Sequence, residues 1–390
     1  MKVLGINFGG RNMKCGEIMV KEALFAAKKA GADVEFVRTV NMRIDHCSGC
    51  GVCSMKRDEG GNVHCIKKDD YARLEEKILD ADGIIVAAPV FSVGTTGQMK
   101  NFIDRFGAAH DRAALDEIQK KRIAEGKTGD ELLDPRYFKK RYVAYMSIGG
   151  ADTPHWVALG LPTMTMFGTS IYMKVVGQID AYGQGRRANP VFDEELMGKC
   201  SELGKRVAEA VGKPYEEVEW YGEEGVCPVC HGKVMMMDQA PEVYCATCGV
   251  KGTMTLEDGR MKICYQDEDL KVSRVRMEGL YDHYWEIEGM KEVCIPKIME
   301  NQEWLEEQLK KYKNFDETIA AMEEEERCRI PVSKKCSGIS MRNFLMVTMK
   351  PRPSNMCGRT TGSTTREWGR GERLSWKPLP GNSGRNRNFI

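Results

Sequence analysis

Short apolar runs alternate with amphipathic stretches along the first half of the chain. The apolar runs are rich in strand-forming residues, and we predict strands at 2–8, 34–37, 84–90, 142–148 and 171–177. The stretches between them repeat apolar positions at helical spacing, and we predict helices at 17–30, 71–80, 97–106 and 193–211. Repeated strand–helix alternation predicts an α/β fold with a doubly wound parallel sheet.

The second half of the chain has a different pattern. Paired CxxC motifs, short strands and few helix-forming residues mark a small separate domain, and helical spacing returns after it. The final residues are rich in Arg, Gly, Ser, Thr, Asn and Pro, which predicts disorder. We therefore divide the chain into an α/β domain at 1–213, a small domain at 222–268, a helical segment at 275–330 and a disordered basic tail at 337–390.

Charge and cysteine content narrow the environment of the protein. The net charge of the chain is +1. Residues 337–390 contain ten Lys or Arg and two Glu, and this positive charge offsets the negative charge of the rest of the chain. The basic tail has no recognisable nucleic-acid-binding module. The first residues lack the pattern of a secretory signal. The stretch at 156–173 has no charged residue but contains Pro162, which favours a buried helix over a membrane span. Fifteen cysteines then predict a cytoplasmic protein with metal or redox chemistry, because cytosolic thiols stay reduced.

Three loops that follow predicted strands carry candidate ligand-binding residues. In an open parallel sheet, ligands bind beyond the carboxyl ends of the strands. The loop at 7–16 is glycine-rich and leads into a helix, so its N–H groups and the cations of Arg11 and Lys14 would suit a single phosphate. The loop at 88–95 offers an apolar wall for a flat ring, and a third loop lies at 147–152. Each loop alone could be an ordinary turn, but three of them at the ends of three strands favour a binding site.

The α/β domain resembles the flavodoxin-like NAD(P)H-dependent FMN reductases and, among them, the iron–sulfur flavoproteins. The resemblance covers about residues 1–213, and its most telling stretches are CIKKDD at 65–70 and ADGIIVAAPVFSVGTTGQMKNFIDRF at 81–106. In that family the first loop holds the FMN phosphate, and the second and third loops line the isoalloxazine ring. The resemblance therefore implies an FMN site formed by Asn7, Gly9, Gly10, Arg11, Met13, Lys14, Cys15, Gly16, Pro89, Val90, Phe91, Ser92, Val93, Gly94, Gly149 and Gly150.

The first loop departs from the family pattern. The family usually has a serine at the position of Gly9 and an Asn-Thr pair at the positions of Cys15 and Gly16. Two hydroxyl donors to the phosphate are therefore missing. The backbone N–H groups, Arg11 and Lys14 would take their place, and we expect weaker FMN binding as a result.

A first group of cysteines follows the second predicted strand. Cys47, Cys50 and Cys53 are each two residues apart, and eleven residues separate Cys53 from Cys65. Four thiolates can hold a [4Fe–4S] centre, and the iron–sulfur flavoproteins that the chain resembles have this arrangement with a shorter final gap. The glycine pair at 60–61 could let Cys65 swing in to complete the cluster.

The same thiols allow two other interpretations. Many FMN reductases without a cluster keep similar cysteines near this position, which would leave these thiols without a metal. A mononuclear zinc site is also open, with His46 or His64 as a substitute ligand.

A second group of cysteines forms two CxxC knuckles separated by fourteen residues: Cys227, Cys230, Cys245 and Cys248. Paired knuckles at this spacing predict a closed tetrahedral zinc site, and the segment resembles a zinc ribbon. A rubredoxin-like iron site is the competing interpretation, but rubredoxins have a wider gap with more aromatic residues. Zinc here would be structural or would serve partner docking.

Together these features predict an FMN-dependent oxidoreductase that transfers electrons from NAD(P)H to an unidentified acceptor. One alternative is an iron–sulfur flavoprotein that exchanges electrons with ferredoxin. Another is a non-catalytic scaffold whose zinc ribbon docks a partner. We expect a homo-oligomer without membrane or nucleic-acid partners. The pattern identifies no catalytic residue, although His110 and His155 are expected near the flavin face.

Overall fold

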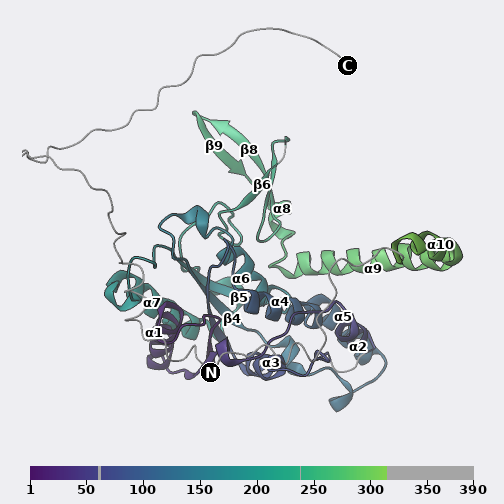
Figure 1. Cartoon of the computed structure of the whole chain (residues 1–390), viewed down its shortest axis with the longest axis horizontal. Helices are drawn as coiled ribbons and strands as arrows, with labels where there is room; N and C mark the ends of the chain where they lie inside the picture. The colour runs from purple at the N-terminus through teal and green to yellow at the C-terminus, as the bar shows by residue number, and fades with distance from the viewer. Residues whose placement is uncertain (60–62, 238, 314–390) are drawn as a thin grey trace, which may run out of the picture. The chain divides into compact units, whose positions relative to one another are not determined.

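A five-stranded parallel sheet lies at the centre of the α/β domain (Figure 1). The computed structural model describes residues 1–59, 63–237 and 239–313 of the chain. The strands are β1 (Lys2–Asn7), β2 (Asp33–Arg38), β3 (Gly83–Pro89), β4 (Tyr142–Ile148) and β5 (Lys174–Ala181). They lie in the order β2-β1-β3-β4-β5 with every neighbouring pair parallel. This is the flavodoxin-like topology, so the predicted fold class is confirmed.

Helices cover both faces of this sheet. One face packs against α1 (Cys15–Lys29) and α7 (Glu194–Ala210), and the other against α3 (Tyr71–Asp80), α4 (Gly97–Ala109) and α6 (Gly160–Thr169). Two further helices, α2 (Val52–Asp58) and α5 (Arg112–Ala124), belong to the same domain. Along β3, Ile84 is buried toward the α4 side and its neighbour Ile85 toward the α1 side. The central strands are mostly apolar because both of their faces are covered.

Element positions follow the apolar pattern closely, with one exception. β4 spans the predicted 142–148 and α3 spans the predicted 71–80. The strand predicted at 171–177 begins later, at Lys174, and continues to Ala181, so that boundary was wrong. Tyr172 adopts a positive φ of 60° in the turn before the strand, and Gly177 lies inside the strand instead of ending it.

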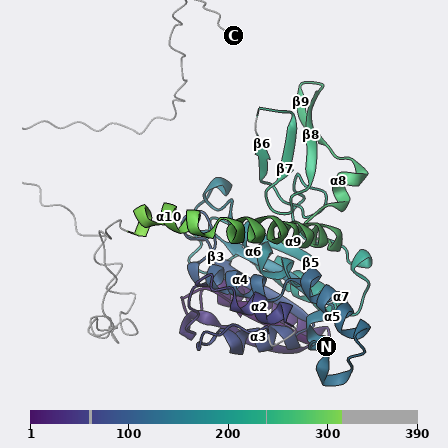
Figure 2. The same cartoon turned by 90° about the vertical axis from the view of Figure 1, so that its right-hand side faces the viewer.

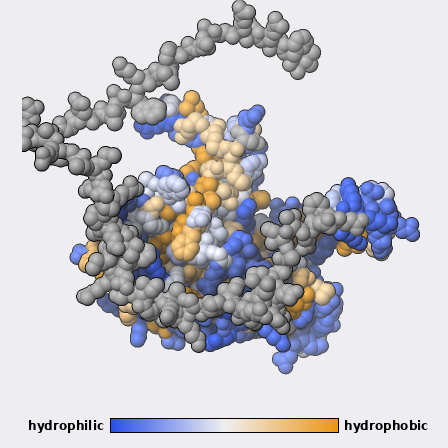
Figure 3. Space-filling view, in the orientation of Figure 1, coloured by the Kyte–Doolittle hydropathy of each residue, from blue (hydrophilic) through white to orange (hydrophobic). Residues whose placement is uncertain are grey.

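A second, antiparallel sheet holds the paired CxxC motifs (Figure 2). Its strands are β6 (Met235–Met237), β7 (Glu242–Cys245), β8 (Lys251–Glu257) and β9 (Arg260–Cys264), in that order across the sheet. We refer to residues 222–268 as the ribbon. Several of its apolar side chains are exposed: Met236, Met237, Leu256 and Met261. In Figure 3 pale and orange surface accordingly extends along the ribbon.

The segment that leads into the ribbon is joined to the edge of the parallel sheet. Tyr221 pairs in parallel with Gly177 of β5. The Tyr221 N–H donates to the Val176 carbonyl at 2.9 Å, and the Tyr221 carbonyl accepts from the Gln178 N–H at 2.9 Å. A Cβ at residue 177 would lie 2.2 Å from the Tyr221 carbonyl oxygen, so this pairing requires glycine.

Helices follow the ribbon: α8 (Asp267–Lys271), α9 (Met277–Glu300) and α10 (Gln302–Lys313). The predicted helical segment at 275–330 is thus helical for most of its described part. Residues Met1–Gln308 form one compact unit. The predicted tail at 337–390 and the predicted flexible glycine pair at 60–61 lie outside the described residues. None of the helices described here combines the length and the apolar character needed to cross a bilayer.

The two helices on one face of the sheet approach each other closely at Gly204 of α7. A Cβ there would lie 1.9 Å from the Ala23 carbonyl oxygen of α1, which is backbone and cannot swing away. Gly198 on the same helix is exposed, and a Cβ there would meet nothing within 4 Å. Glycine is therefore needed for packing at one position of α7 and not at the other.

We predict opposite effects for the same substitution at these two positions. Gly204→Ala should lower the free energy of unfolding by about 1–3 kcal/mol, because the two helices must separate. Gly198→Ala should raise it by about 0.5–1 kcal/mol, because alanine has the higher helix propensity. Urea unfolding followed by circular dichroism measures both. A Gly204→Ala protein as stable as the wild type would contradict this packing.

Candidate functional site

The first loop is shaped by the side chain of Asn7 at the end of β1. The Asn7 Oδ1 accepts a hydrogen bond from the Gly9 N–H at 3.0 Å, and its Nδ2 donates to the Gly9 carbonyl at 3.4 Å. Asn7 itself is buried. Met13 has a positive φ of 49°, and its N–H donates to Glu17 Oε2 at 2.9 Å. The loop is therefore held in shape by hydrogen bonds at both ends.

Gly16 is explained by the position of Asn7. A Cβ at residue 16 would lie 2.4 Å from Asn7 Oδ1, so the asparagine amide occupies the space that a larger residue at 16 would need. The threonine expected from the family pattern would collide with it. In place of the missing hydroxyl side chain, the space is filled by Asn7, whose hydrogen bonds to Gly9 hold the loop in shape.

Positive charge gathers at this loop. α1 begins at Cys15 without a side-chain cap, so the N–H groups of its first turn are open to an anion. Arg11 is exposed and Lys14 half-buried, and within the described part of the chain neither forms a recorded ion pair. These groups together fit one phosphate.

One carboxylate also lies at the loop. Glu17 is buried and forms ion pairs with Lys21 at 2.6 Å and Arg38 at 3.5 Å. Burial acts to raise the pKa of Glu17, but hydrogen bonds from Lys21 and from the Met13 N–H outweigh it and leave the pKa below its usual value. Lys21 and Arg38 therefore balance the negative charge of Glu17, and Arg11 and Lys14 remain available to bind a phosphate.

The second loop, after β3, is a strained turn that exposes an aromatic ring. Phe91 and Gly94 exchange backbone hydrogen bonds of 2.8 and 3.2 Å, with Ser92 and Val93 between them at φ values of 50° and 72°. Positive φ is unfavourable for a β-branched residue, and such strain concentrates at binding sites. Phe91 is 63% exposed at the base of this turn. The turn therefore presents an apolar surface to a flat ligand.

The third loop, after β4, is fixed by the residues that follow β5. The Gly149 N–H donates to the Ala181 carbonyl at 2.9 Å, and the Gly149 carbonyl accepts from the Gln184 N–H at 3.0 Å. A Cβ at residue 149 would lie 2.1 Å from the Val157 side chain, whereas one at residue 150 would meet nothing within 4 Å. Gln184, which no sequence motif indicated, also contacts Cys15, with 4.0 Å between its Oε1 and the Cys15 Sγ.

The three loops thus follow β1, β3 and β4, which are neighbours in the sheet. Every residue that the resemblance assigned to the FMN site belongs to one of them or to the strand end before it. The first loop, with its N–H groups and cations, suits the phosphate of FMN. The apolar turn of the second loop and the glycines of the third suit its flat ring. We judge that the residues fit this cofactor.

Neither histidine considered from the sequence has a demonstrated role. His110 is fully buried, its ring stacks on Phe106 with 4.2 Å between centroids, and its Nε2 lies 3.6 Å from the Glu75 carboxylate. Burial lowers the pKa of His110 to about 4, so the imidazole is neutral. His110 lies at the far end of α4 from the second loop and its ring contacts Tyr137, which precedes β4, so it lies away from the three loops. His155 is exposed and follows the third loop directly.

The first cysteine group does not converge in the structure. Cys47 and Cys50 are exposed, and Cys53 is partly exposed at the start of α2. Cys65 packs against the core. Among the described residues, these four thiols do not form a group of metal-binding size. A hydrogen bond from the Val52 N–H lowers the pKa of Cys50, which marks it as an accessible thiolate candidate.

A buried ion pair next to this group fixes Cys65. Arg105 Nη1 and Nη2 donate to the two oxygens of Asp69 at 2.6 and 2.9 Å, and both side chains are almost fully buried. Burial acts to lower the pKa of Arg105, but its hydrogen bonds to Asp69 and to the Cys65 thiol outweigh it and raise the pKa. Cys65 would have to leave Arg105 to join a cluster. The [4Fe–4S] site stays a prediction.

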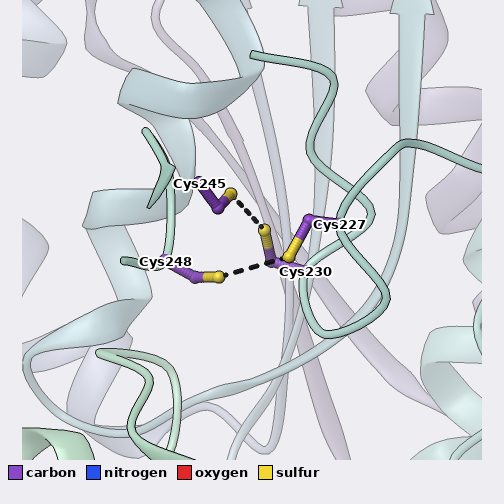
Figure 4. A group of neighbouring side chains, drawn as sticks. All are labelled: Cys227, Cys230, Cys245 and Cys248. Carbon is purple, nitrogen blue, oxygen red and sulfur yellow. Dashed lines mark hydrogen bonds between the residues drawn. The ribbon is translucent and has the colours of Figure 1, made fainter. Parts of the chain in front are cut away.

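The second cysteine group does converge. All four sulfur atoms of the ribbon cysteines lie within 4.8 Å of one another, and they point toward a common centre (Figure 4). The Sγ atoms of Cys227 and Cys248 are 3.5 Å apart, as are those of Cys230 and Cys245. A tetrahedral ion with metal–sulfur bonds of about 2.3 Å would place its sulfurs about 3.8 Å apart. The thiols therefore have the geometry of a four-cysteine metal site.

The two knuckles are built alike, with one informative difference. Each ends in a residue at positive φ: His231 at 56° after Cys230, and Gly249 at 82° after Cys248. Histidine tolerates this conformation poorly compared with glycine. Stacking of His231 on Trp220, with 4.0 Å between ring centroids, and a hydrogen bond of 3.0 Å between His231 Nδ1 and Glu224 Oε2 offset that cost. Sequence reasoning had missed this stack.

Comparison with known proteins places the chain among flavoproteins. The family model for NADPH-dependent FMN reductase matches residues 1–178. A protein named flavone synthase cfoJ from Aspergillus candidus is 28% identical over 293 residues, which cover 74% of this chain and 89% of that protein. An iron-sulfur flavoprotein from Archaeoglobus fulgidus is 31% identical over 215 residues, or 55% of this chain and 82% of that protein. A solved structure titled flavone reductase superposes with a TM-score of 0.68 at 27% identity, and covers 82% of this chain and 100% of its own.

The loop cations generate a prediction about cofactor affinity. Arg11→Ala and Lys14→Ala should each weaken FMN binding about tenfold to a hundredfold, because a charge-assisted hydrogen bond contributes about 1.5–3 kcal/mol. Lys29→Ala removes an exposed cation at the far end of α1 and should leave affinity unchanged. Titration of the apoprotein with FMN, followed by quenching of flavin fluorescence, measures all three. Equal affinity in all three variants would remove both cations from the phosphate site.

The convergent thiols generate a prediction about metal content. Cys248→Ser should release one metal ion per chain and unfold the ribbon, because the thiols make up most of its buried core. Cys264→Ser alters a β9 cysteine that stands outside the group and should keep the ion. Elemental analysis of both purified variants gives the count and identifies zinc or iron. If Cys248→Ser retained the wild-type metal content, the ribbon would not be the metal site.

Proposed function

The chain belongs to the flavodoxin-like family of NADPH-dependent FMN reductases and iron–sulfur flavoproteins, and we propose that, as an FMN-dependent oxidoreductase, it transfers electrons from NAD(P)H to a flat aromatic acceptor. The FMN dependence follows from the family. The choice of donor is supported by the family model that covers residues 1–178. The choice of acceptor is supported by the relatives named for flavones, which match most of the chain.

The strained Phe91–Gly94 turn beside the cationic first loop is the observation that carries the proposal. Bound FMN would supply the hydride-transfer chemistry. The chain would hold the phosphate with the first-turn N–H groups of α1, Arg11 and Lys14. Phe91 and Val93 would cover the ring, and Gly150, where a Cβ would meet nothing within 4 Å, would leave space for it beside the third loop. The backbone of all three loops is already held by hydrogen bonds, so these groups start from fixed positions along the chain.

The ribbon metal is zinc in this proposal, with a structural role. Four sulfur ligands without an open position are typical of structural zinc sites. The thiols also suit iron, and metal analysis separates the two. The twelve cysteines in the described part of the chain are all free, which supports the reducing cytoplasm as the place where the protein acts.

An iron–sulfur flavoprotein that exchanges electrons with ferredoxin is the second candidate. It is favoured by the order of Cys47, Cys50, Cys53 and Cys65 and by the similarity to the Archaeoglobus protein. It ranks lower because these four thiols lie apart and Cys65 is turned toward Arg105. A cluster would require this loop to rearrange.

We predict that NADPH or NADH bleaches the visible flavin absorbance of the FMN-loaded protein in the absence of oxygen. Free FMN at the same concentration is the control and should react far more slowly, because it lacks a site that aligns the two reactants. Iron and sulfide analysis of the same anaerobic preparation tests separately for the [4Fe–4S] centre. Bleaching by reduced ferredoxin alone, with four irons per chain, would instead establish the second candidate.

A further inference from the structure

A cavity of about 740 Å³ lies between the edge of the parallel sheet and the ribbon, within the unit formed by Met1–Gln308. Its lining comes from the start of α6, from β5 and from the segment that leads into the ribbon. Leu161 and Pro162 line it from α6, Asp180 from β5, and Trp220 and His231 from the ribbon side. This volume is in the range of small-molecule sites.

The cavity adjoins the loops assigned to FMN. Pro154 and His155, which directly follow the third loop, belong to its lining. Gln184 also lines it, while the Gln184 N–H bonds the Gly149 carbonyl and the Gln184 side chain contacts Cys15 of the first loop. One residue is thus shared by the cavity and by two of the three loops.

The lining combines aromatic surface with unused hydrogen-bonding capacity. The rings of Trp220 and His231 stack nearly parallel, at 10° between planes, and Tyr182 adds a third aromatic residue. Trp220 Nε1 is buried without a hydrogen-bond partner among the described residues, and Asp180 Oδ1 is buried with only the neighbouring Ser147 hydroxyl beside it. Buried polar groups without partners are uncommon and mark places where a ligand or water completes the bonding. Burial also raises the pKa of Asp180, so its carboxyl group holds a proton more readily than an exposed one.

The extent of the similarity to one relative points to the ribbon. An alignment over 74% of a 390-residue chain necessarily includes residues 222–268, so the similarity to the flavone synthase extends across the ribbon. The solved flavone reductase likewise covers 82% of this chain, more than the α/β domain alone could supply. In both relatives named for flavones the matched residues therefore extend beyond the α/β domain and into the ribbon.

We infer that this cavity binds the acceptor, a flat aromatic compound with oxygen substituents, and that the ribbon supplies one wall of its binding site. The inference rests on the proposed function and deepens it by assigning the acceptor to named residues. Trp220 and His231 provide the aromatic wall, and Leu161 and Pro162 provide the aliphatic one. Trp220 Nε1 donates to an oxygen of the ligand, and Asp180 bonds a second oxygen after a small side-chain rotation.

The test is isothermal titration calorimetry of the full-length, FMN-loaded protein with 7-hydroxyflavone, without NAD(P)H. Trp220→Ala should weaken binding about tenfold, because it removes both an aromatic contact and a hydrogen-bond donor. Ala158→Trp places a large ring into the cavity from the α6 side and should abolish measurable binding. Trp285→Ala removes an exposed tryptophan of α9 outside the cavity lining and is the matched control, with the wild-type dissociation constant expected.

Each variant is also analysed for FMN and metal, which shows that both domains are folded. Weakened binding in the two cavity variants but not in the control supports the inference. Failure of 7-hydroxyflavone to bind the wild type, or binding to both cavity variants with the wild-type constant, overturns it. If the ligand binds as expected but NAD(P)H does not reduce the flavin, the proposed donor fails while the cavity assignment is supported.

Discussion

The pairing of Tyr221 with Gly177 is the constraint on which the arrangement of the chain after β5 depends. Two backbone hydrogen bonds add Tyr221 to the edge of the sheet, and only glycine leaves room for its carbonyl at that position. The same pairing covers the edge of β5, which would otherwise expose unpaired backbone groups. It also places Trp220 beside the sheet and lets the following residues form the other wall of the cavity. The backbone pairing of Tyr221 with Gly177 thereby positions the side chains that line the cavity.

The candidate cofactor site contains a similar pair, in which the glycine at position 16 leaves room for the side chain of Asn7. Asn7 occupies the space above Gly16 and orders the first loop, so the loop keeps its shape without the hydroxyl side chains usual in the family. At the second loop the chain instead tolerates a strained Val93 to hold Phe91 outward. Both devices fix the backbone before any ligand arrives, which reduces the entropy cost of binding.

The spacing of apolar residues predicted the strands and helices of the α/β domain because it reflects which side chains are buried in the core. The apolar run at 142–148 matches β4 residue for residue, since every position of a strand covered on both faces is buried and nearly all of them are apolar. The four ribbon cysteines were likewise predictable, because two tight knuckles leave little freedom in how their sulfurs meet. The strand predicted at 171–177 lies at Lys174–Ala181 instead, and Gly177 inside it is required by a contact with Tyr221, forty-four residues later, which no local pattern reveals. The cavity could not be predicted for the same reason: Asp180, Trp220 and His231 belong to different elements, and only the tertiary fold brings them together.

The metal site gains a functional meaning from this arrangement. Among the described residues of the ribbon, the buried apolar side chains are those of the four cysteines, Val243 and Val250, so little apolar burial holds it folded without an ion. His231 follows Cys230 directly and stacks on Trp220, so the knuckle that holds the metal also holds the aromatic wall of the cavity. A metal ion held by these thiols, zinc or iron, would therefore stabilise the wall against which the proposed acceptor binds. On this view the redox chemistry belongs to the parallel sheet, and the choice of acceptor belongs in part to the ribbon.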